Sequence, residues 1–426
     1  MLRLESVRLS LQGPLVDLTI AEGTIRAIEE AGDDTPATTR LVLPAFVDLH
    51  THLRDPGFTE AEDLWTGTAA AVAGGYSDVF AMANTSPPTD RVSRVAELLR
   101  RAPRGTARIR PVSAVTTDLA GRSLVDVAAL TAAGVRLFSD DGRCVEDPRL
   151  VRAMLQACRE QDVVFGQHAQ DSAIVGSGAV NARVAQRAGA SPWLPAGEER
   201  VIERDLSIAA DTGGHLHVCH VSTRGSVELI RQAKKAGVPV TCEVTPHHLM
   251  LDDEAALNSG AALKVNPPLR SRDDVLALRE ALIDGTVDVV ATDHAPHPAP
   301  AKAKGWADSA FGLTGLETAL PVVAAVLRAP TTGEVDWVRL TEVLSAVPAR
   351  IGGIAHQAGR PVRIGEPANL CVVETGISEV IRGDRHRSRS RNNPFLGWRA
   401  HERVACTIVD GRVVHGRADR DHGRGG

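Results

Sequence analysis

Two histidines separated by one residue, His50 and His52, follow the apolar run LPAFVDL and precede Leu53 and Arg54. In a β-strand, residues two apart point to the same side, so these imidazoles converge while Thr51 faces away. Two converging neutral imidazoles are a beginning of a zinc site, but an isolated pair of this kind is as often an ordinary pair of surface or core histidines. The pair therefore needs support from the rest of the chain.

Further imidazoles and carboxylates follow other predicted strands. Asp140 and Asp141 end the run VRLFSDD, His168 ends VVFGQHA, His220 lies in HLHVCHVST, and Asp293 follows DVVAT. Any one of them has an ordinary explanation, since an aspartate after a strand often caps a helix. Together, four histidines and two aspartates suffice for two divalent ions about 3.5–4 Å apart. Imidazole with carboxylate and no thiolate favours zinc, with manganese or cobalt as substitutes.

Other polar residues of these strands are not assigned to the site. His215 and His217 share the strand of His220 but have the opposite parity, so we expect them to face the helices or to be structural. Cys219 also points away from the site and is expected in the core. These expectations leave His220 as the ligand from this strand.

The elements that must position these groups alternate between strands and amphipathic helices. Helices are predicted at 92–102, 150–160, 227–237 and 275–285, with starts at Asp147-Pro148 and at Ser271. Eight strands are predicted at 43–50, 77–85, 108–117, 135–141, 163–169, 215–223, 239–248 and 288–297. Eight βα units in one run indicate a (β/α)8 TIM-type barrel, in which active-site groups lie at the carboxyl ends of the strands.

The two ends of the chain differ from this pattern. Residues 1–45 and 360–426 contain short strands with turns, which predicts that both ends form one small β-sandwich domain with a flexible tail. The barrel then occupies residues 46–359, and 315 onwards adds two more helices. The stretch RGDRHRSRSRNNPFLGWRA (382–400) is expected to be a solvated basic connection.

Composition narrows the class of protein. A net charge of -5 gives no basic face, so nucleic acid and anionic membranes are not expected as partners. No apolar run approaches the roughly 20 residues that span a bilayer, and the amino terminus is no signal peptide. The six cysteines are scattered without a C-x-x-C pair, which suggests reduced thiols. We expect a soluble, cytoplasmic protein.

Several motifs resemble a known family. They are HTHLRDPG (50–57), MANT (82–85), FSDDG (138–142), HVCHVST (217–223), TPHHL (245–249), NPPLR (266–270), TDHAPH (292–297) and SRSRNNPF (388–395). Over nearly the whole chain they closely resemble the amidohydrolase superfamily and, within it, the bacterial type I dihydroorotases. The resemblance implies the reversible cyclisation of N-carbamoyl-L-aspartate to (S)-dihydroorotate plus water, in de novo pyrimidine biosynthesis.

The resemblance also implies a role for each matching residue. Asp293 would bind the first metal and act as general acid and base for a zinc-bound hydroxide, and Asp141 would bridge two zinc ions, although Asp140 stays an alternative. One or two zinc ions per subunit are implied, with two favoured. The implied metal ligands are His50, His52, Asp141, His168, His220 and Asp293. The implied substrate contacts are His52, Arg54, Asn84, Asn266, His297, Phe311 and Gly312.

Two features separate this chain from related enzymes. Hydantoinases and allantoinases bridge their metals with a carboxylated lysine on strand 4, but the first lysine here is Lys234. Arg54 can bind a free carboxylate in bidentate fashion, which the acid substrates carry and a plain hydantoin lacks. One departure is Gln170, where the family often has glutamate, which puts a hydrogen bond behind the metal site in doubt.

The remaining expectations concern partners. A catalytically dead barrel that only supports a partner would be expected to lose metal ligands, whereas all six are present here. We expect a homodimer, and a complex with aspartate carbamoyltransferase is a further hypothesis that the resemblance supplies. Residues 298–312 are a candidate lid, since Pro298, Pro300, Gly305 and Gly312 interrupt regular structure.

Overall fold

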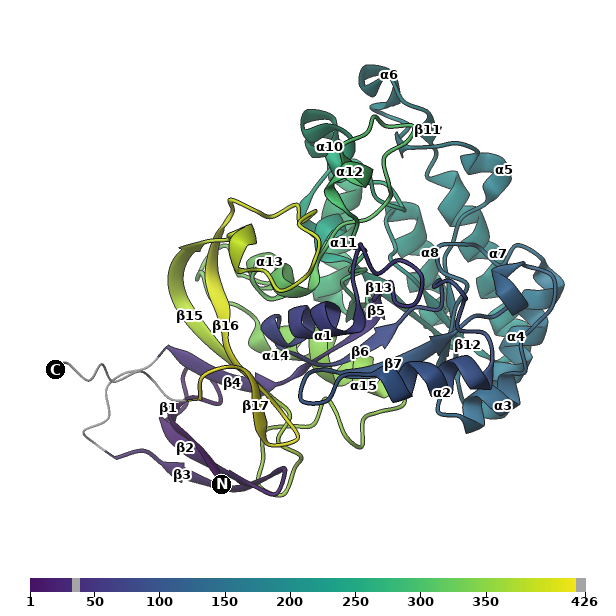
Figure 1. Cartoon of the computed structure of the whole chain (residues 1–426). Coiled ribbons are helices and arrows are strands. Elements are labelled where there is room, and N and C mark those ends of the chain that lie inside the picture. Colours follow the sequence, from purple (N-terminus) through teal and green to yellow (C-terminus); the bar gives the residue numbers. More distant parts are fainter. Residues whose placement is uncertain (33–38, 419–426) are drawn as a thin grey trace.

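The computed structural model describes residues 1–32 and 39–418 (Figure 1). Its centre is a sheet of eight strands in the order β14-β13-β12-β9-β8-β7-β6-β5, each parallel to its neighbours. The strands are β5 (Phe46–Thr51), β6 (Tyr76–Ala81), β7 (Arg108–Ser113), β8 (Leu137–Phe138), β9 (Val164–Gln167), β12 (His215–Val218), β13 (Val240–Val244) and β14 (Val289–Val290). A parallel bridge from Thr51 to His294 joins the two edges. This arrangement confirms the predicted TIM-type barrel.

Helices follow the strands around the outside of the barrel. The larger ones are α1 (Leu64–Ala73), α2 (Val92–Arg101), α3 (Val127–Ala132), α4 (Pro148–Gln161), α7 (Ala196–Thr212), α8 (Arg224–Lys235), α10 (Asp253–Ser259), α11 (Arg272–Asp284) and α13 (Ala319–Val326). Both predicted helix starts are confirmed: Asp147 caps α4 ahead of Pro148, and Ser271 forms a capping box with Asp274 at α11. No helix in the described ranges is both long and apolar enough to cross a membrane.

Shorter elements complete the barrel domain. The loops above the barrel contain α5 (Ser172–Val175), β10 (Val180–Asn181), α6 (Ala185–Ala188), β11 (Pro192–Trp193), α9 (Pro246–Met250) and α12 (Ala299–Lys302). The last barrel segment contains α14 (Trp337–Thr341) and α15 (Val347–Ile351), joined by one π-helical turn. Within the described residues, four further short turns are 3₁₀-helical: three in the barrel segment (Thr117–Leu119, Gly260–Leu263 and Leu316–Thr318) and one between β15 and β16 (Gly383–Arg385). Of these short elements, α5, α6, β11 and α12 lie beyond the same end of the barrel (Figure 1).

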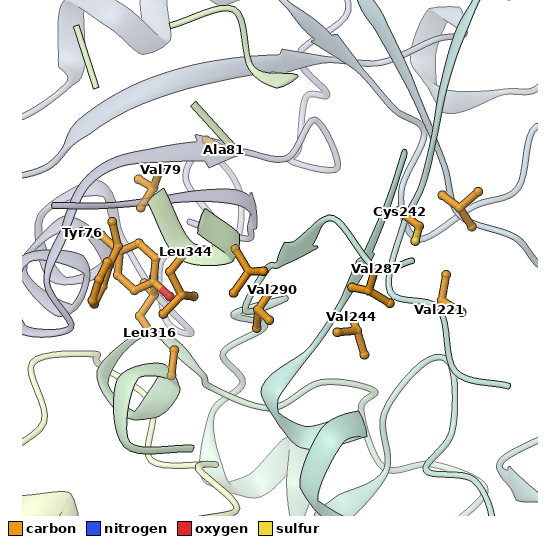
Figure 2. Packing of buried hydrophobic residues seen from close by; sticks show 14 of the residues in the cluster. Tyr76, Val79, Ala81, Val221, Cys242, Val244, Val287, Val290, Leu316 and Leu344 are labelled. Carbon is orange, nitrogen blue, oxygen red and sulfur yellow. The ribbon is translucent and has the colours of Figure 1, made fainter. Parts of the chain in front are cut away.

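Two layers of apolar side chains hold the barrel. The outer layer lies between strands and helices and includes Tyr76, Val244, Val290 and Leu316 (Figure 2). The inner layer fills the barrel itself and includes residues of six of the eight strands and of α15, among them Val47, Phe80, Val112, Val289 and Ile351. Because the interior is packed, polar groups are left for the open, carboxyl end of the strands.

Both ends of the chain contribute to the small β domain. One sheet has the order β1-β2-β3, formed by β1 (Leu2–Val7), β2 (Val16–Ala21) and β3 (Thr24–Glu30). The other has the order β17-β16-β15-β4, formed by β4 (Arg40–Pro44), β15 (Leu370–Val380), β16 (Arg399–Val409) and β17 (Arg412–Gly416). Since β4 pairs with β15 and one apolar cluster joins both sheets, the predicted domain built from both chain ends is confirmed.

The segment between β15 and β16 differs from its expected form. It was predicted to be a solvated connection, but Ser388, Ser390, Asn393 and Phe395 are buried. Ser390 donates to the backbone carbonyl of Ala61, at 2.7 Å, so the segment packs on the barrel. The flexible tail predicted at the end of the chain falls largely on residues 419–426, which lie outside the described ranges.

Candidate active site

The six predicted metal ligands come together at the carboxyl end of the barrel. His50 belongs to β5 and His52 follows it, while His168 comes directly after β9. His220 lies two residues after β12 and Asp293 three residues after β14, with φ angles of 31° and 44°. A positive φ is uncommon outside glycine, and aspartate and histidine are among the residue types that adopt it more readily. All six residues are at most 5 % exposed.

Asp141 lies at the centre of this group. Its Oδ2 is 3.3 Å from His50 Nε2 and 3.4 Å from His52 Nε2. Its Oδ1 is 3.0 Å from His168 Nδ1 and 3.1 Å from His220 Nε2. Each oxygen of Asp141 therefore faces a different histidine pair.

Asp140, the alternative to Asp141, is occupied elsewhere. Its carboxylate accepts hydrogen bonds from the backbone amides of Val115 and Thr116, at 2.8 and 3.0 Å, and from the Thr116 hydroxyl. It thus fastens the loop after β7, and its side chain is committed to that backbone.

Three of the histidines have their second ring nitrogen fixed by an oxygen acceptor. His50 Nδ1 is 2.6 Å from Glu243 Oε1, His52 Nδ1 is 2.9 Å from Asn84 Oδ1, and His168 Nε2 is 2.9 Å from Gln170 Oε1. An oxygen without a hydrogen can only accept, so the facing nitrogen carries the proton. The other nitrogen of each ring then directs its lone pair at Asp141. This is the arrangement that metal-binding histidines have in proteins.

The surroundings of His50 Nε2 indicate whether these six side chains could hold a metal ion. This buried atom has no hydrogen-bond partner in the described part of the chain, although it lies near Asp141 and Asp293, at 3.3 and 3.5 Å. The lone pair of this buried nitrogen and the two carboxylates face one another, and all three groups would be satisfied by a positive charge placed between them. A divalent cation supplies that charge, and the nitrogen and oxygen donors suit zinc. The residues therefore fit a metal.

The charges of the cluster depend on one another. Burial opposes ionisation of Asp141 and Asp293, but the imidazole of His50 and its neighbours outweigh it, lowering the pKa of Asp293 to about 2 and that of Asp141 well below its usual range. Burial also opposes a charge on His50, yet Asp141 and Glu243 raise its pKa. The carboxylates are thus ionised at neutral pH, as metal ligands must be.

The predicted substrate residues form a half-buried ring around the ligands. Arg54 Nη2 lies 3.3 Å from His297 Nε2, and that nitrogen donates to the backbone carbonyl of Phe311, at 2.7 Å. Gly312 has a φ of 139°, and a Cβ there would lie 2.7 Å from the carbonyl oxygen of Ala295. Only glycine fits this close approach of two loops.

Asn266 reaches the cluster from the opposite side. Its Nδ2 donates to Gln170 Oε1, at 3.0 Å, the same oxygen that faces His168. Its Oδ1 is buried without a hydrogen-bond partner in the described residues, which leaves an acceptor for a ligand. Asn84 contacts the cluster through its Oδ1, which faces His52 Nδ1 at 2.9 Å.

One neighbour of the site, Glu243, was missed by reasoning from the sequence, while His217 and Cys219 were set aside as structural or core residues and are indeed buried. Glu243, which holds His50, was not singled out, although a glutamate inside the apolar strand β13 was a visible signal. His217 was expected to be helix-facing or structural; it contacts Glu243 Oε2, at 3.1 Å, and so supports the site indirectly. Cys219 is buried close to His50 and Glu243, and burial raises the pKa of its thiol to about 12.

Comparison with known proteins places this geometry in a family. A family model described as "Dihydro-orotase-like" matches residues 39–226. A protein of Streptomyces coelicolor named "Dihydroorotase" is 43 % identical, covering 95 % of this chain and 96 % of its own. Similar proteins of that name in Leifsonia xyli subsp. xyli and Mycobacterium tuberculosis are 44 % and 42 % identical, covering 94 % and 95 % of this chain and 95 % of each relative.

The chain belongs to the dihydroorotase family. Solved structures agree with this membership at the level of the fold. An L-hydantoinase from Arthrobacter aurescens has a TM-score of 0.83 at 25 % identity, covering 97 % of this chain and 96 % of its own. A dihydropyrimidinase from Brevibacillus agri has a TM-score of 0.81 at 21 % identity, covering 97 % and 95 %. As a member of the dihydroorotase family, the chain is a hydrolase with the amidohydrolase barrel and a group of residues that could hold a metal ion.

Proposed function

We propose that this chain interconverts N-carbamoyl-L-aspartate and (S)-dihydroorotate, with the six buried ligands holding two zinc ions. The observation that carries the proposal is the split contact of Asp141, whose two oxygens face different histidine pairs. Arg54 at the edge of the same cluster supports an acidic substrate. Family membership supports the reaction, which forms or breaks one ring amide bond.

The first ion would be held by His50, His52 and Asp293, and the second by His168 and His220, with Asp141 between them. When bound, zinc lowers the pKa of a water and polarises the carbonyl that the water attacks. The chain itself supplies fixed donors: each lone pair is aimed by an acceptor on the far side of its ring. A closed, buried floor of protein also keeps bulk water away from the reacting atoms.

Asp293 is the proposed proton carrier. Its Oδ1 is 3.0 Å from His52 Nε2, at the inner edge of the cluster. In ring opening it accepts the proton of the attacking water and delivers it to the ring nitrogen, while the bond from that nitrogen to the carbonyl carbon breaks. In ring closure the same steps run in reverse: the ureido nitrogen forms a bond to the side-chain carboxylate carbon and gives one proton to Asp293. One carboxylate oxygen then leaves as water, with that proton and a second one taken up from solution.

Arg54, Asn84 and Asn266 are proposed to bind the substrate carboxylate and ring. A guanidinium presents two parallel donors that match a carboxylate, and the amides supply both donors and acceptors. His297 and the backbone at Phe311 and Gly312 are proposed to close the far side of the ring. Holding both reacting groups in line removes much of the entropy cost of the reaction.

Broader features are proposed on the same basis. We propose that the small β domain comprises residues 1–45 and 360–426 and that the barrel comprises residues 46–359. A cytoplasmic location, a homodimer and an association with aspartate carbamoyltransferase are proposed from the family resemblance. Each can be checked separately by fractionation, by light scattering and by co-purification.

The proposed function is tested by metal analysis together with a cyclisation assay. Purified chain is expected to contain zinc and to convert carbamoyl aspartate to dihydroorotate at acidic pH and the reverse at alkaline pH, since ring closure consumes a proton. Activity should vanish after chelation and return with zinc. Hydantoin hydrolysis that proved faster than dihydroorotate hydrolysis would contradict the proposal.

A further inference from the structure

We propose that the two metal positions hold their ions with unequal strength, tightly at His50 and weakly at His168, and that Glu243 and Gln170 set much of the difference. This inference rests on the proposed two-metal site. It concerns positioning residues, because neither Glu243 nor Gln170 lies among the proposed ligands.

The two positions differ first in their number of donors. The first position has four donors, from His50, His52, Asp293 and Oδ2 of Asp141. The second has three among the described residues, from His168, His220 and Oδ1 of Asp141. The additional carboxylate of Asp293 brings a full negative charge to the first ion only, which favours its retention.

His50 and His168 also differ in the acceptor that binds their second ring nitrogen, the one that faces away from the proposed metal. His50 Nδ1 donates to Glu243 Oε1 over 2.6 Å, and both side chains are buried. Glu243 Oε2 is held in turn by His217 Nε2, at 3.1 Å, so the carboxylate is fixed at both oxygens. A charged acceptor makes the opposite ring nitrogen a stronger electron donor and fixes its direction.

The acceptor for the second ring nitrogen of His168 is a neutral side-chain amide. His168 Nε2 donates to Gln170 Oε1 over 2.9 Å, and the same oxygen also accepts from Asn266 Nδ2, at 3.0 Å. An amide oxygen carries only a partial charge, whereas the Glu243 carboxylate carries a full one. Both acceptor oxygens are shared, because Glu243 Oε1 also accepts from the backbone amide of His220, at 3.3 Å, so the charge is what distinguishes them. His168 therefore receives less support than His50, and its Nδ1 is the weaker donor to a metal. Gln170 is only half-buried, so water further screens this contact.

The geometry makes opposite predictions for two isosteric substitutions. Gln170→Glu adds a charge behind His168 and should strengthen only the weak position. Glu243→Gln removes the charge behind His50 but keeps an oxygen that can accept from Nδ1, so it should weaken only the tight position. Loss of an outer partner of this kind changes metal affinity about 10- to 100-fold.

The experiment measures zinc retained per chain against a graded series of competing chelators, using the full chain loaded with zinc. Wild type is expected to release its ions in two steps. In Gln170→Glu, the first ion should be released only by chelators that bind zinc about 10- to 100-fold more tightly than those that release it from wild type. In Glu243→Gln, the second ion should be released by chelators that bind zinc more weakly, by a similar factor. Metal is read by mass spectrometry, without reference to turnover.

Glu198→Gln is the matched control. Glu198 is also a buried carboxylate, but its Oε1 accepts from the backbone amides of Ser222 and Thr223, at 2.9 and 3.2 Å, and not from a proposed ligand. This variant should leave both release steps unchanged. Thermal unfolding of each metal-free variant reports the fold separately. If Glu243→Gln does not fold, the half-buried Gln170→Glu carries the test alone.

Three results would overturn the inference: release of both ions in one step from wild type, a shift of the same step by both variants, or no effect of Gln170→Glu. A wild type that holds a single zinc supports it if Gln170→Glu raises the content to two, and overturns it otherwise. The cyclisation assay is a separate readout. Two unequal zinc steps without cyclisation of carbamoyl aspartate would refute the proposed function alone.

Discussion

The side-chain amide of Asn392 donates a hydrogen bond to the backbone carbonyl oxygen of Gly312, at 3.1 Å, across 80 residues of sequence. The same Nδ2 lies 3.3 Å from the carbonyl oxygen of Ala295, and Oδ1 accepts from the backbone amide of His297, at 3.3 Å. One side chain from the segment between β15 and β16 thus joins both sides of the loop after β14. The small β domain thereby helps to shape the proposed substrate site.

Asn392→Ala should weaken substrate binding more than turnover. Without its three hydrogen bonds, the loop carrying His297 and Gly312 loses its brace, while the metal ligands keep theirs. We expect KM for carbamoyl aspartate to rise about tenfold, which corresponds to roughly 1.4 kcal/mol. Steady-state kinetics and zinc content measured on the same preparation test this, and zinc content should not change.

The neighbouring Asn393 supplies the control. Its Nδ2 donates to the carbonyl oxygen of Thr314 and to the Thr318 hydroxyl, both at 3.0 Å, away from His297. Asn393→Ala should therefore lower the thermal stability without raising KM. Equal effects of the two variants on KM would show that Asn392 acts only through the general stability of the segment.

The fold was predictable because its signals are local. Each barrel strand is a short apolar run, and each helix repeats apolar residues at helical spacing, so counting elements was enough to recognise the barrel. The segment 382–400 was misjudged for a related reason. Ser388 and Ser390 are buried while Arg389 and Arg391 face outward. In the sequence, the charge of the arginines obscures this alternation of buried and exposed residues, which has a period of two.

The site was predictable where topology alone brings residues together. Side chains at the carboxyl ends of barrel strands must converge, so His50 and His168 could be paired from 118 residues apart in sequence. The choice of Asp141 over Asp140 needed side-chain directions, which sequence does not give. The contacts of Gln170 with Asn266 and of Asn392 with Gly312 depend on how separate loops pack, and no local pattern indicates them.

His215 should make the stability of the fold depend on pH. Burial and the nearby His217 lower its pKa from 6.5 to about 4, although Asp288 and Asp162 act in the opposite direction and Lys234 in the same one. Between these values the unfolded chain binds a proton that the folded chain does not. Stability should therefore fall as the pH decreases from about 6.5 to 4, by at most about 1.4 kcal/mol per pH unit from this group.

Urea unfolding of wild type and of His215→Gln at several pH values measures this contribution. The variant should show a shallower loss of stability over that pH window, because glutamine does not titrate. His401 is exposed on β16, and His401→Gln should leave the slope as in wild type. Parallel curves for wild type and His215→Gln would contradict the assignment.

Arg54→Met should separate substrate binding from metal binding. Arg54 contacts no proposed ligand by a hydrogen bond, and its Nε lies 3.3 Å from the carbonyl oxygen of Pro296. Loss of a charged pair with the substrate carboxylate is expected to raise KM for carbamoyl aspartate roughly 10- to 100-fold at unchanged zinc content. Arg101→Met is the control, because Arg101 pairs with Asp55 at 2.5 Å outside the cluster. An unchanged KM in Arg54→Met would assign the carboxylate to another residue.

Asp293→Asn should remove proton transfer while keeping the shape of the site. Asparagine retains an oxygen toward His52 but cannot accept and return a proton, so turnover should fall about 10²- to 10⁴-fold. Zinc content should fall less, since five of the six proposed ligands remain. Asp140→Asn is the matched control at the end of another barrel strand, β8. The Asp140 carboxylate accepts from the backbone amides of Val115 and Thr116, so this variant should lose thermal stability and keep its zinc. Turnover of Asp293→Asn near that of wild type would transfer the role of proton carrier to another group.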